Sequence, residues 1–151
     1  WPDAWERKYL NAGPNETSVV DEEAELGNVY YYKVYAVKGD RESDEEEQQF
    51  NFYLPSPINI SYEYNWNLPN RIRLLWTNNA TWADSIVIAK KVAEGEWASP
   101  YTVVAGGTTE FMDMDFNINV VNTWGFTTHY QDHISNQYLY TLMPPNKGET
   151  N

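Results

Sequence analysis

The chain has two histidines, His129 and His133, whose spacing is that of two metal ligands on one face of a helix. Asp132 lies between them, but no glutamate follows His129, and the β-favouring neighbours Thr128 and Tyr130 indicate a strand. In a strand, residues four positions apart are separated by about 13 Å, which is too far to share one ion. We therefore expect two surface histidines and no metal site.

Two acidic runs, residues 21–25 and 44–47, are the other candidates for binding a cation. Calcium needs several oxygen atoms that converge on one point, and neither run has the alternating acidic positions followed by glycine of an EF-hand loop. We expect solvated loop charge, with weak cation binding at a domain junction as the alternative.

The sequence shows no nucleophile with a matching base and no glycine-rich phosphate loop, so we expect no enzymatic activity and no cofactor. Its 151 residues carry 22 acidic and 10 basic side chains, a net charge of −12. Binding to nucleic acid or to an anionic membrane would therefore lack its electrostatic contribution. The chain has no cysteine and no apolar run of about 18 residues, so we expect neither disulfides nor membrane insertion of this segment.

Aromatic residues are the better candidates for binding, since the chain has 7 Trp and 12 Tyr. Trp76 and Trp124 fall in predicted strands and are expected in the core. Trp66 and Trp82 fall in predicted loops, and Trp97 lies in a short region before a strand. These three residues are the candidates for contact with a protein or a carbohydrate, because flat aromatic rings suit both; framework packing and contacts between domains are the favoured explanation of such aromatic residues.

The elements that must position these residues are β-strands. Residues 30–37 are rich in β-formers and alternate between two faces, and turn residues separate this run from the similar ones that follow. The similar runs are residues 71–76, 85–89, 101–105, 110–116, 123–130 and 137–142. Short strands about ten residues apart, without a helical apolar period, predict an all-β sandwich or barrel. The side chains expected in its interior are Tyr32, Val34, Ala36, Ile72, Leu74, Trp76, Val87, Phe111 and Phe126.

An internal repeat with a period near 90 residues divides the chain. The pairs Trp5/Trp97, Tyr9/Tyr101, Thr17/Thr109 and Asp21/Asp113 share an offset of 92 residues, and Asn28/Asn122 has an offset of 94. This period is the length of a whole sandwich domain. The sequence therefore predicts the back half of one domain followed by a complete second one.

The first copy resembles the fibronectin type III family. Its residues 17–21, the Leu26-Gly27-Asn28 turn, the run Tyr30-x-Tyr32-x-Val34-x-Ala36 and the loop 39–43 match the family pattern of strand E, the E–F turn, strand F and the loop after it. The resemblance implies strands C′, E, F and G in this part of the chain. It also implies that Tyr30 is a tyrosine-corner residue whose hydroxyl bonds to the backbone of the E–F turn.

The second copy covers the whole family pattern but is more divergent. Residues 56–61 resemble strand A, 71–77 strand B and 85–91 strand C, while Trp124 takes the place of the corner tyrosine and Thr128 that of the usual valine. The resemblance implies immunoglobulin-like, fibronectin type III β-sandwiches in tandem. Residues 1–54 would form the C-terminal half of one domain, 55–145 a complete domain, and 146–151 a linker or tail.

Such domains resemble the spacers and adhesive modules of larger proteins. The resemblance implies a non-catalytic structural module of an extracellular, cell-surface or virion protein, such as a fibre or tail component, with other proteins or neighbouring subunits as partners. The alternatives are an accessory carbohydrate-binding or linker module of a secreted carbohydrate-active enzyme, and a receptor ectodomain. In a receptor, the loop aromatics around Trp66 and Trp82 would form one exposed patch. The strands missing from the first copy are expected from upstream residues or from another subunit.

Overall fold

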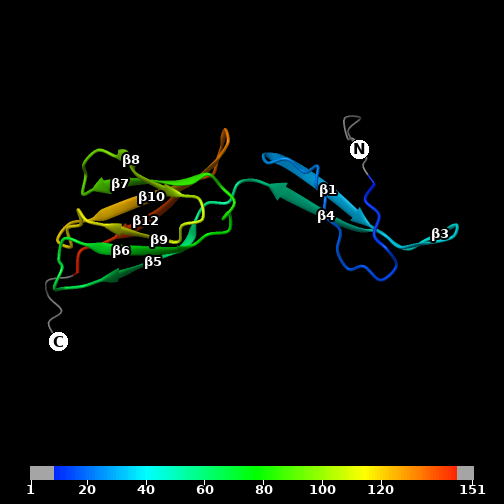
Figure 1. Cartoon of the computed structure of the whole chain (residues 1–151), viewed down its shortest axis with the longest axis horizontal. Helices are drawn as coiled ribbons and strands as arrows, with labels where there is room; N and C mark the ends of the chain where they lie inside the picture. Colours follow the sequence, from blue (N-terminus) through cyan, green and yellow to red (C-terminus); the bar gives the residue numbers. More distant parts are fainter. Residues whose placement is uncertain (1–8, 146–151) are drawn as a thin grey trace. The chain divides into compact units, whose positions relative to one another are not determined.

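The computed structural model describes residues 9–145, which form two units that meet at Phe52 and Tyr53. Each unit is described by itself. The described residues form strands and no helix (Figure 1), so none of them builds a helix that could span a membrane. Trp5, which the repeat pairs with Trp97, and the expected tail 146–151 lie outside the described residues.

The first unit is built on one long β-hairpin. Its strands are β1 (Asn28–Val34), β2 (Val37–Lys38), β3 (Arg41–Glu42) and β4 (Glu46–Phe52). β1 and β4 are antiparallel, with Tyr30 opposite Phe50, and the β2–β3 hairpin lies between them. The strand expected over residues 30–37 is interrupted because Ala36 exchanges hydrogen bonds with Ser43 instead of continuing the β1–β4 ladder.

No sheet covers the first unit's hairpin within residues 9–52. Residues 17–21, expected as strand E, form no strand, and none of the residues 9–52 is buried. The expectation that Tyr32, Val34 and Ala36 face an interior is therefore wrong for this unit as it stands: Tyr32 is half-buried, Ala36 is exposed and Val34 is 69% exposed. The physical reason is that the opposing layer of a sandwich is missing.

The second unit is a two-layered sandwich. Its strands are β5 (Ile58–Tyr64), β6 (Ile72–Thr77), β7 (Ser85–Val92), β8 (Ala98–Ala105), β9 (Glu110–Asp113), β10 (Asn122–Tyr130), β11 (His133–Ile134) and β12 (Tyr138–Leu142). One sheet has the order β5-β6-β9, and the other runs β11-β10-β7-β8 with β12 paired to β10. All pairings within these two sheets are antiparallel. In β5 the register shifts between Ile58 and Ser61, where Asn59 has a positive φ of 54°.

The core lies between the two sheets. It consists of Ile72, Leu74, Trp76, Ile86, Ile88, Phe116, Trp124 and Phe126, with the half-buried Phe111 packed against it. The interior positions expected in β6, β9 and β10 are thus correct, but Val87 in β7 is wrong. Val87 is only half-buried, and its neighbours Ile86 and Ile88 face the core. Four consecutive apolar residues begin at Ile86, so alternation alone could not decide the face.

Candidate functional site

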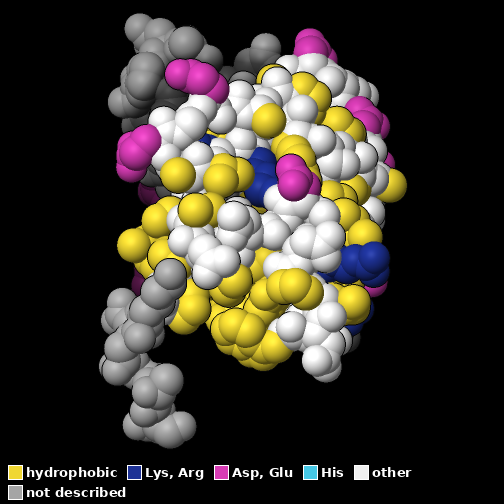
Figure 2. Space-filling view, turned by 90° about the vertical axis from the view of Figure 1, so that its left-hand side faces the viewer, with side chains coloured by type: hydrophobic (Ala, Val, Ile, Leu, Met, Phe, Trp, Pro, Cys, Tyr) yellow, Lys and Arg dark blue, Asp and Glu magenta, His cyan; other side chains and the backbone are white. Residues whose placement is uncertain are grey.

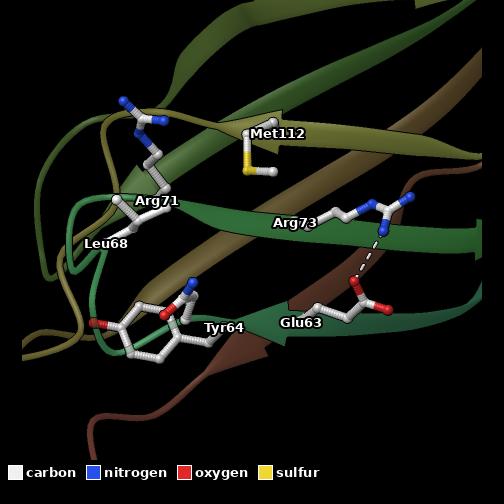
Figure 3. Close-up of a pocket in the computed structure, with 7 residues that line it drawn as sticks. Glu63, Tyr64, Leu68, Arg71, Arg73 and Met112 are labelled. Carbon is white, nitrogen blue, oxygen red and sulfur yellow. Dashed lines mark hydrogen bonds and ion pairs between the residues drawn. The ribbon is translucent and has the colours of Figure 1, made fainter.

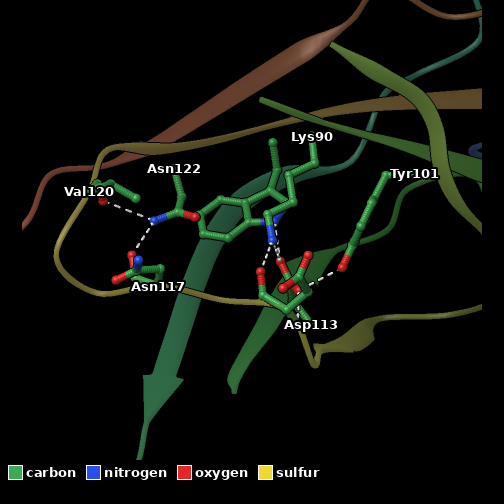
Figure 4. Close-up of polar contacts among 8 residues, drawn as sticks. Lys90, Tyr101, Asp113, Asn117, Val120 and Asn122 are labelled. Carbon is green, nitrogen blue, oxygen red and sulfur yellow. Dashed lines mark hydrogen bonds and ion pairs between the residues drawn. The ribbon is translucent and has the colours of Figure 1, made fainter. Parts of the chain in front are cut away.

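The Asp113 carboxylate, at the end of β9, is the centre of a buried polar cluster (Figure 4). Its Oδ1 accepts hydrogen bonds from the Tyr101 hydroxyl at 2.8 Å and from the Asp115 amide at 2.9 Å. Its Oδ2 accepts one from Trp124 Nε1 at 2.9 Å and lies 2.8 Å from the Lys90 ammonium. β7, β8, β9 and β10 each contribute one side chain, so the cluster ties both sheets together.

The cluster holds its charges in fixed states. Burial opposes ionisation of Asp113, but the Lys90 ion pair and the bonds from Asp115, Tyr101 and Trp124 outweigh it and lower the carboxyl pKa. Burial and the bond to Asp113 raise the pKa of the Tyr101 hydroxyl. Lys90 also donates to the Asp115 carbonyl and lies 4.9 Å from the centre of the Tyr101 ring. Because these groups are bonded to each other and Lys90, Asp113 and Trp124 are buried, the cluster links the two sheets through fixed polar contacts.

Sequence reasoning found Asp113 only as a member of the repeat and did not find Lys90. The available signal was a lysine directly after the apolar residues 86–89, since a charge in a core strand needs a buried partner. The buried side-chain amide of Asn122 lies beside the cluster (Figure 4). Asn122 Nδ2 donates to the carbonyls of Asn117 at 2.8 Å and Val120 at 2.9 Å, which fixes the loop before β10.

Trp66 is the most exposed of the three tryptophans that the sequence singled out. It lies in the β5–β6 loop with 69% of its surface in solvent, and its ring meets that of Tyr64 edge to face at 4.9 Å. The Tyr64 ring also packs on the buried Phe116, and its hydroxyl donates to the Pro69 carbonyl at 3.2 Å. The Trp66 ring thus packs against the fixed side chain of Tyr64 and remains accessible to solvent.

A shallow hollow of about 320 Å³ lies next to this loop (Figure 3). Its lining residues are Glu63, Tyr64, Asn65, Leu68, Arg71, Arg73 and Met112. Arg73 bonds to Glu63 at 2.9 Å and also to Glu110, and these bonds, with that to Glu110 the stronger, raise the pKa of its guanidinium. Figure 3 shows the Arg71 guanidinium directed away from Arg73. The hollow therefore combines the apolar side chains of Leu68 and Met112 with two arginines. Arg73 is bonded to carboxylates, whereas Arg71 is directed away from it.

Trp82 and Trp97 lie in other loops of the second unit. Trp82, between β6 and β7, is 48% exposed and meets the Tyr130 ring edge to face at 5.0 Å. Trp97, between β7 and β8, is 41% exposed. Trp66 precedes β6 and Trp82 follows it, so the two rings lie at opposite ends of that strand and do not form the shared patch expected of a receptor ectodomain.

Hydrophobic side chains gather at the end of the second unit that carries the β5–β6, β7–β8 and β9–β10 loops (Figure 2). The exposed large apolar residues within these loops are Trp66, Leu68, Trp97 and Met114. Scattered exposed apolar residues are ordinary on a protein surface, but a gathering at one end marks a candidate contact surface.

His129 lies in a strand, as expected, whereas His133 was expected in the loop that follows this strand and lies in a short strand instead. β10 includes His129, and His133 belongs to β11, which pairs with the end of β10. Both side chains are half-buried. Within residues 9–145, no three His, Cys, Asp or Glu side chains are grouped so that they could hold a metal ion. Of the acidic run 44–47, Glu45 forms an ion pair with Lys33 at 3.0 Å.

Tyr30 contacts the turn that precedes its strand. Its hydroxyl accepts a hydrogen bond from the Glu25 amide at 2.7 Å and donates to the Glu25 carbonyl at 3.4 Å. In the same unit the Tyr32 hydroxyl donates to Asp21 at 3.1 Å, and burial together with this bond raises the Tyr32 pKa. A contact between Tyr30 and the turn is the geometry that the resemblance implied, and the corner role stays a prediction.

No family model matches the sequence, and no curated protein matches it. Several solved structures are similar to the chain. A segment of two fibronectin type III domains from chicken tenascin is 19% identical with a TM-score of 0.53, over 78% of this chain and 65% of that segment. The fibronectin type III domain of human collagen alpha-1(XX) is 14% identical with a TM-score of 0.50, over 64% and 92%. A redesigned β-sandwich protein is 10% identical with a TM-score of 0.50, over 60% and 95%.

The fold is that of a fibronectin type III domain. At these identities the likeness establishes the fold alone, and the chain spans less than two thirds of the tenascin segment. In the fibronectin type III sandwich of the second unit, Trp124 stands where the resemblance implied a corner tyrosine. Its ring is fully buried, and its Nε1 bonds to Asp113 rather than to the turn backbone. The Asp113 cluster therefore provides the fixed polar contact at this position.

Proposed function

We propose that the chain is a non-catalytic structural and adhesive module of a larger extracellular, cell-surface or virion protein. It acts as a spacer and as a surface for binding proteins, neighbouring domains or subunits of the same assembly. The fibronectin type III fold supports this proposal, because sandwiches of this kind are rigid and expose their loops at two ends. The Asp113 cluster supports it too, since its ionised groups, Lys90 and Asp113, are buried and paired with each other.

The observation that carries the proposal is the exposure of Trp66. A large aromatic side chain that is supported by a fixed ring, at an end of the sandwich with further exposed apolar loop residues, is a typical centre of a protein contact. Trp97, at the same end of the sandwich, extends this surface, whereas Trp82 at the opposite end provides a second and separate contact.

Carbohydrate binding, as in an accessory module of a secreted carbohydrate-active enzyme, is the second candidate. The specific observation in its favour is that the Trp66 ring contacts Tyr64, and Tyr64 lines the open hollow together with the hydrogen-bonding side chains of Arg71 and Glu63. A sugar would stack on the indole and bond to these polar side chains.

The two candidates are separated by one experiment with three proteins: the unchanged chain, Trp66→Ala and Trp82→Ala. Beads coated with each protein are mixed with cells or particles of the source, and adhesion is counted with and without a panel of soluble oligosaccharides. Protein contact predicts adhesion that Trp66→Ala weakens at least tenfold and that no oligosaccharide blocks. Inhibition of adhesion by one oligosaccharide, together with quenching of tryptophan fluorescence by that sugar, would instead support carbohydrate binding. Equal adhesion of all three proteins would reject the assigned surface.

The location is tested separately. An antibody against the chain should label intact cells or particles of the source without permeabilisation. Labelling only after permeabilisation would contradict the extracellular or virion assignment.

A further inference from the structure

Arg71, the last residue of the β5–β6 loop, is an exposed arginine in the hollow of Figure 3. Five polar side chains line this hollow, and four of them already form hydrogen bonds within the chain: Glu63, Tyr64, Asn65 and Arg73. The guanidinium of Arg71 forms neither a hydrogen bond nor an ion pair with any of residues 9–145. Its charge is therefore available to a ligand.

Arg73, two positions further along, shows the contrasting arrangement. Its guanidinium bonds to Glu63 at 2.9 Å and also to Glu110, so its charge is neutralised within the chain. Glu63, the acidic side chain of the hollow, is held by Arg73, and Figure 3 shows Arg71 directed away from this pair. A ligand carboxylate that entered the hollow would thus find its counter-charge at Arg71.

The backbone that carries Arg71 is held in place by its neighbours. The Arg71 amide donates to the Leu68 carbonyl at 3.1 Å, and the Leu68 amide donates to the Asn65 carbonyl at 2.8 Å. The Asn70 carbonyl accepts a hydrogen bond from the amide of the buried Phe116 at 3.1 Å, which ties this loop to the β9–β10 loop. Binding at Arg71 therefore has to order a side chain and not a loop, which keeps its entropic cost low.

Apolar side chains border the same hollow. Leu68 and Met112 line it, and each has 44% of its surface exposed. Tyr64 lines it as well and contacts the exposed Trp66 ring. The planar guanidinium of an arginine matches the two oxygens of a carboxylate, while the apolar side chains match an aliphatic or aromatic group beside it. An acidic residue next to an apolar one in a peptide offers both features.

We propose that Arg71 binds an aspartate or glutamate side chain of an acidic peptide segment in the protein partner, and that a neighbouring apolar side chain of this segment lies on Leu68 and Met112. The inference rests on the proposed function, because it names the chemistry of the partner for the surface around Trp66. A phosphate or an acidic sugar would also pair with Arg71. A phosphate would gain from a second free cation and a sugar from several free hydrogen-bonding groups, whereas the other polar groups of the hollow are already bonded.

Nuclear magnetic resonance of the isotope-labelled 151-residue chain tests the proposal. The probe is a capped tripeptide of phenylalanine, aspartate and phenylalanine, and its control has asparagine in place of aspartate. We expect the aspartate peptide to shift the Arg71 Nε–H signal and the amide signals of Leu68 and Met112. The asparagine peptide should bind at least about tenfold more weakly, because it lacks the charge-assisted bond. Absence of these shifts, or equal binding of the two peptides, would overturn the proposal.

Two simple anions are titrated in the same way. Inorganic phosphate represents a phosphorylated ligand, and glucuronate represents an acidic sugar. Neither carries an apolar group for Leu68 and Met112, so both should bind more weakly than the aspartate peptide. Binding of phosphate or of glucuronate at least as tight as that of the peptide would assign the site to that class of ligand and overturn the proposal.

Two substitutions that each remove one positive charge provide the matched comparison. Arg71→Gln should abolish the shifts caused by the aspartate peptide. Lys91→Gln should leave them unchanged, because Lys91 lies on β7 outside the hollow and likewise has no ion pair with any of residues 9–145. Equal binding by the two variants would overturn the proposal. Thermal unfolding should be the same for both, since neither side chain is bonded within the described residues.

The adhesion experiment separates a failure of this inference from a failure of the proposed function. Arg71→Gln should weaken adhesion by about tenfold, as the loss of a charge-assisted bond does. Adhesion that Trp66→Ala weakens and Arg71→Gln leaves unchanged would reject the acidic partner and keep the proposed function. Adhesion that neither substitution changes would reject the contact surface as well.

Discussion

The Lys90 ammonium lies 2.8 Å from the Asp113 carboxylate, and both side chains are withdrawn from solvent in the core of the second unit. A buried ion pair of this kind is not by itself a large source of stability, because both charges lose their hydration. Its consequence is that the two residues depend on each other. Tyr101 and Trp124 bond to the same carboxylate, so this dependence extends to both sheets.

Removing one partner of the pair should be strongly destabilising. Lys90→Met leaves the Asp113 carboxylate buried without its counter-charge, which we expect to lower the free energy of unfolding by about 3–5 kcal/mol. Urea unfolding followed by tryptophan fluorescence measures this loss. Lys91→Met, one position along β7 and only half-buried, is the matched control and should change stability by less than about 0.5 kcal/mol. Equal effects of the two substitutions would contradict the role of the pair.

Stability should fall in acid because of the same carboxylate. The pKa of Asp113 is lower in the folded chain than its ordinary value, so the stability from its ionisation is present above about pH 4 and is lost as the pH falls through the folded pKa. Urea unfolding at a series of pH values from about 6 to 2 should therefore show a steeper loss for the unchanged chain than for Asp113→Asn. Parallel pH profiles of the two proteins would show that Asp113 does not contribute to the acid dependence.

Tyr101 should act in the opposite direction at alkaline pH. Its pKa is raised by burial and by the bond to Asp113, so its contribution is intact below the ordinary tyrosine value of about 10 and is lost as the pH rises toward the folded pKa. Tyr101→Phe should remove this alkaline loss of unfolding free energy. The change in slope between about pH 9 and 11.5 is the measurement, and an unchanged slope would contradict the expectation.

Gly106 and Gly107 form a natural pair for testing a close contact of the backbone. A Cβ atom at Gly106 would lie 1.8 Å from the Ala83 carbonyl oxygen, whereas at Gly107 the nearest atom would be 3.6 Å away. Since the Ala83 backbone must move to make room, Gly106→Ala should lower the free energy of unfolding by about 1–3 kcal/mol or more. Gly107→Ala should have a much smaller effect. Thermal unfolding of both variants measures this difference. An unchanged stability of Gly106→Ala would show that the Ala83 backbone can move aside without cost.

Two tryptophans should differ sharply in their effect on stability. Trp76 is 6% exposed, packs 5.4 Å from Phe126 and donates from Nε1 to the Thr108 carbonyl at 2.8 Å. Trp76→Ala should therefore cost about 3–5 kcal/mol in chemical denaturation. Trp66→Ala should cost less than about 1 kcal/mol, because its ring is exposed. A loss below 1 kcal/mol for Trp76→Ala would mean that β6 faces the other way.

The alternation of apolar residues was sufficient to predict the sandwich and most of its core. Ile72, Leu74 and Trp76 occupy alternate positions of β6, and the polar Arg73 and Thr77 mark the opposite face although Leu75 is apolar, so their common face followed from the period of a strand. Val87 was assigned to the wrong face because both of its neighbours are apolar as well. In such a run, burial is decided by the sheet on the other side and not by local sequence.

The buried polar cluster could not be derived in the same way. Lys90 and Asp113 are 23 positions apart in the sequence and pair only once the two sheets are stacked. The exposed tryptophans Trp66 and Trp82 could be assigned to loops, since turn residues surround them. That these loops lie at opposite ends of one strand also follows from the sequence, since the predicted strand over residues 71–76 separates them and the structure has β6 there.

The irregular start of β5 bears on how the molecule behaves beside its own copies. β5 is an edge strand, and the shift of register at Asn59 twists its first residues out of line while the Asn59 side chain reaches Thr77 on the neighbouring strand. A flat, unpaired edge invites the edge of another molecule to continue the sheet, which is the first step of aggregation. A bulge interrupts the row of free amides and carbonyls that such pairing needs. In a protein that presents many sandwiches at high local concentration, this one residue would help to keep neighbouring sheets separate.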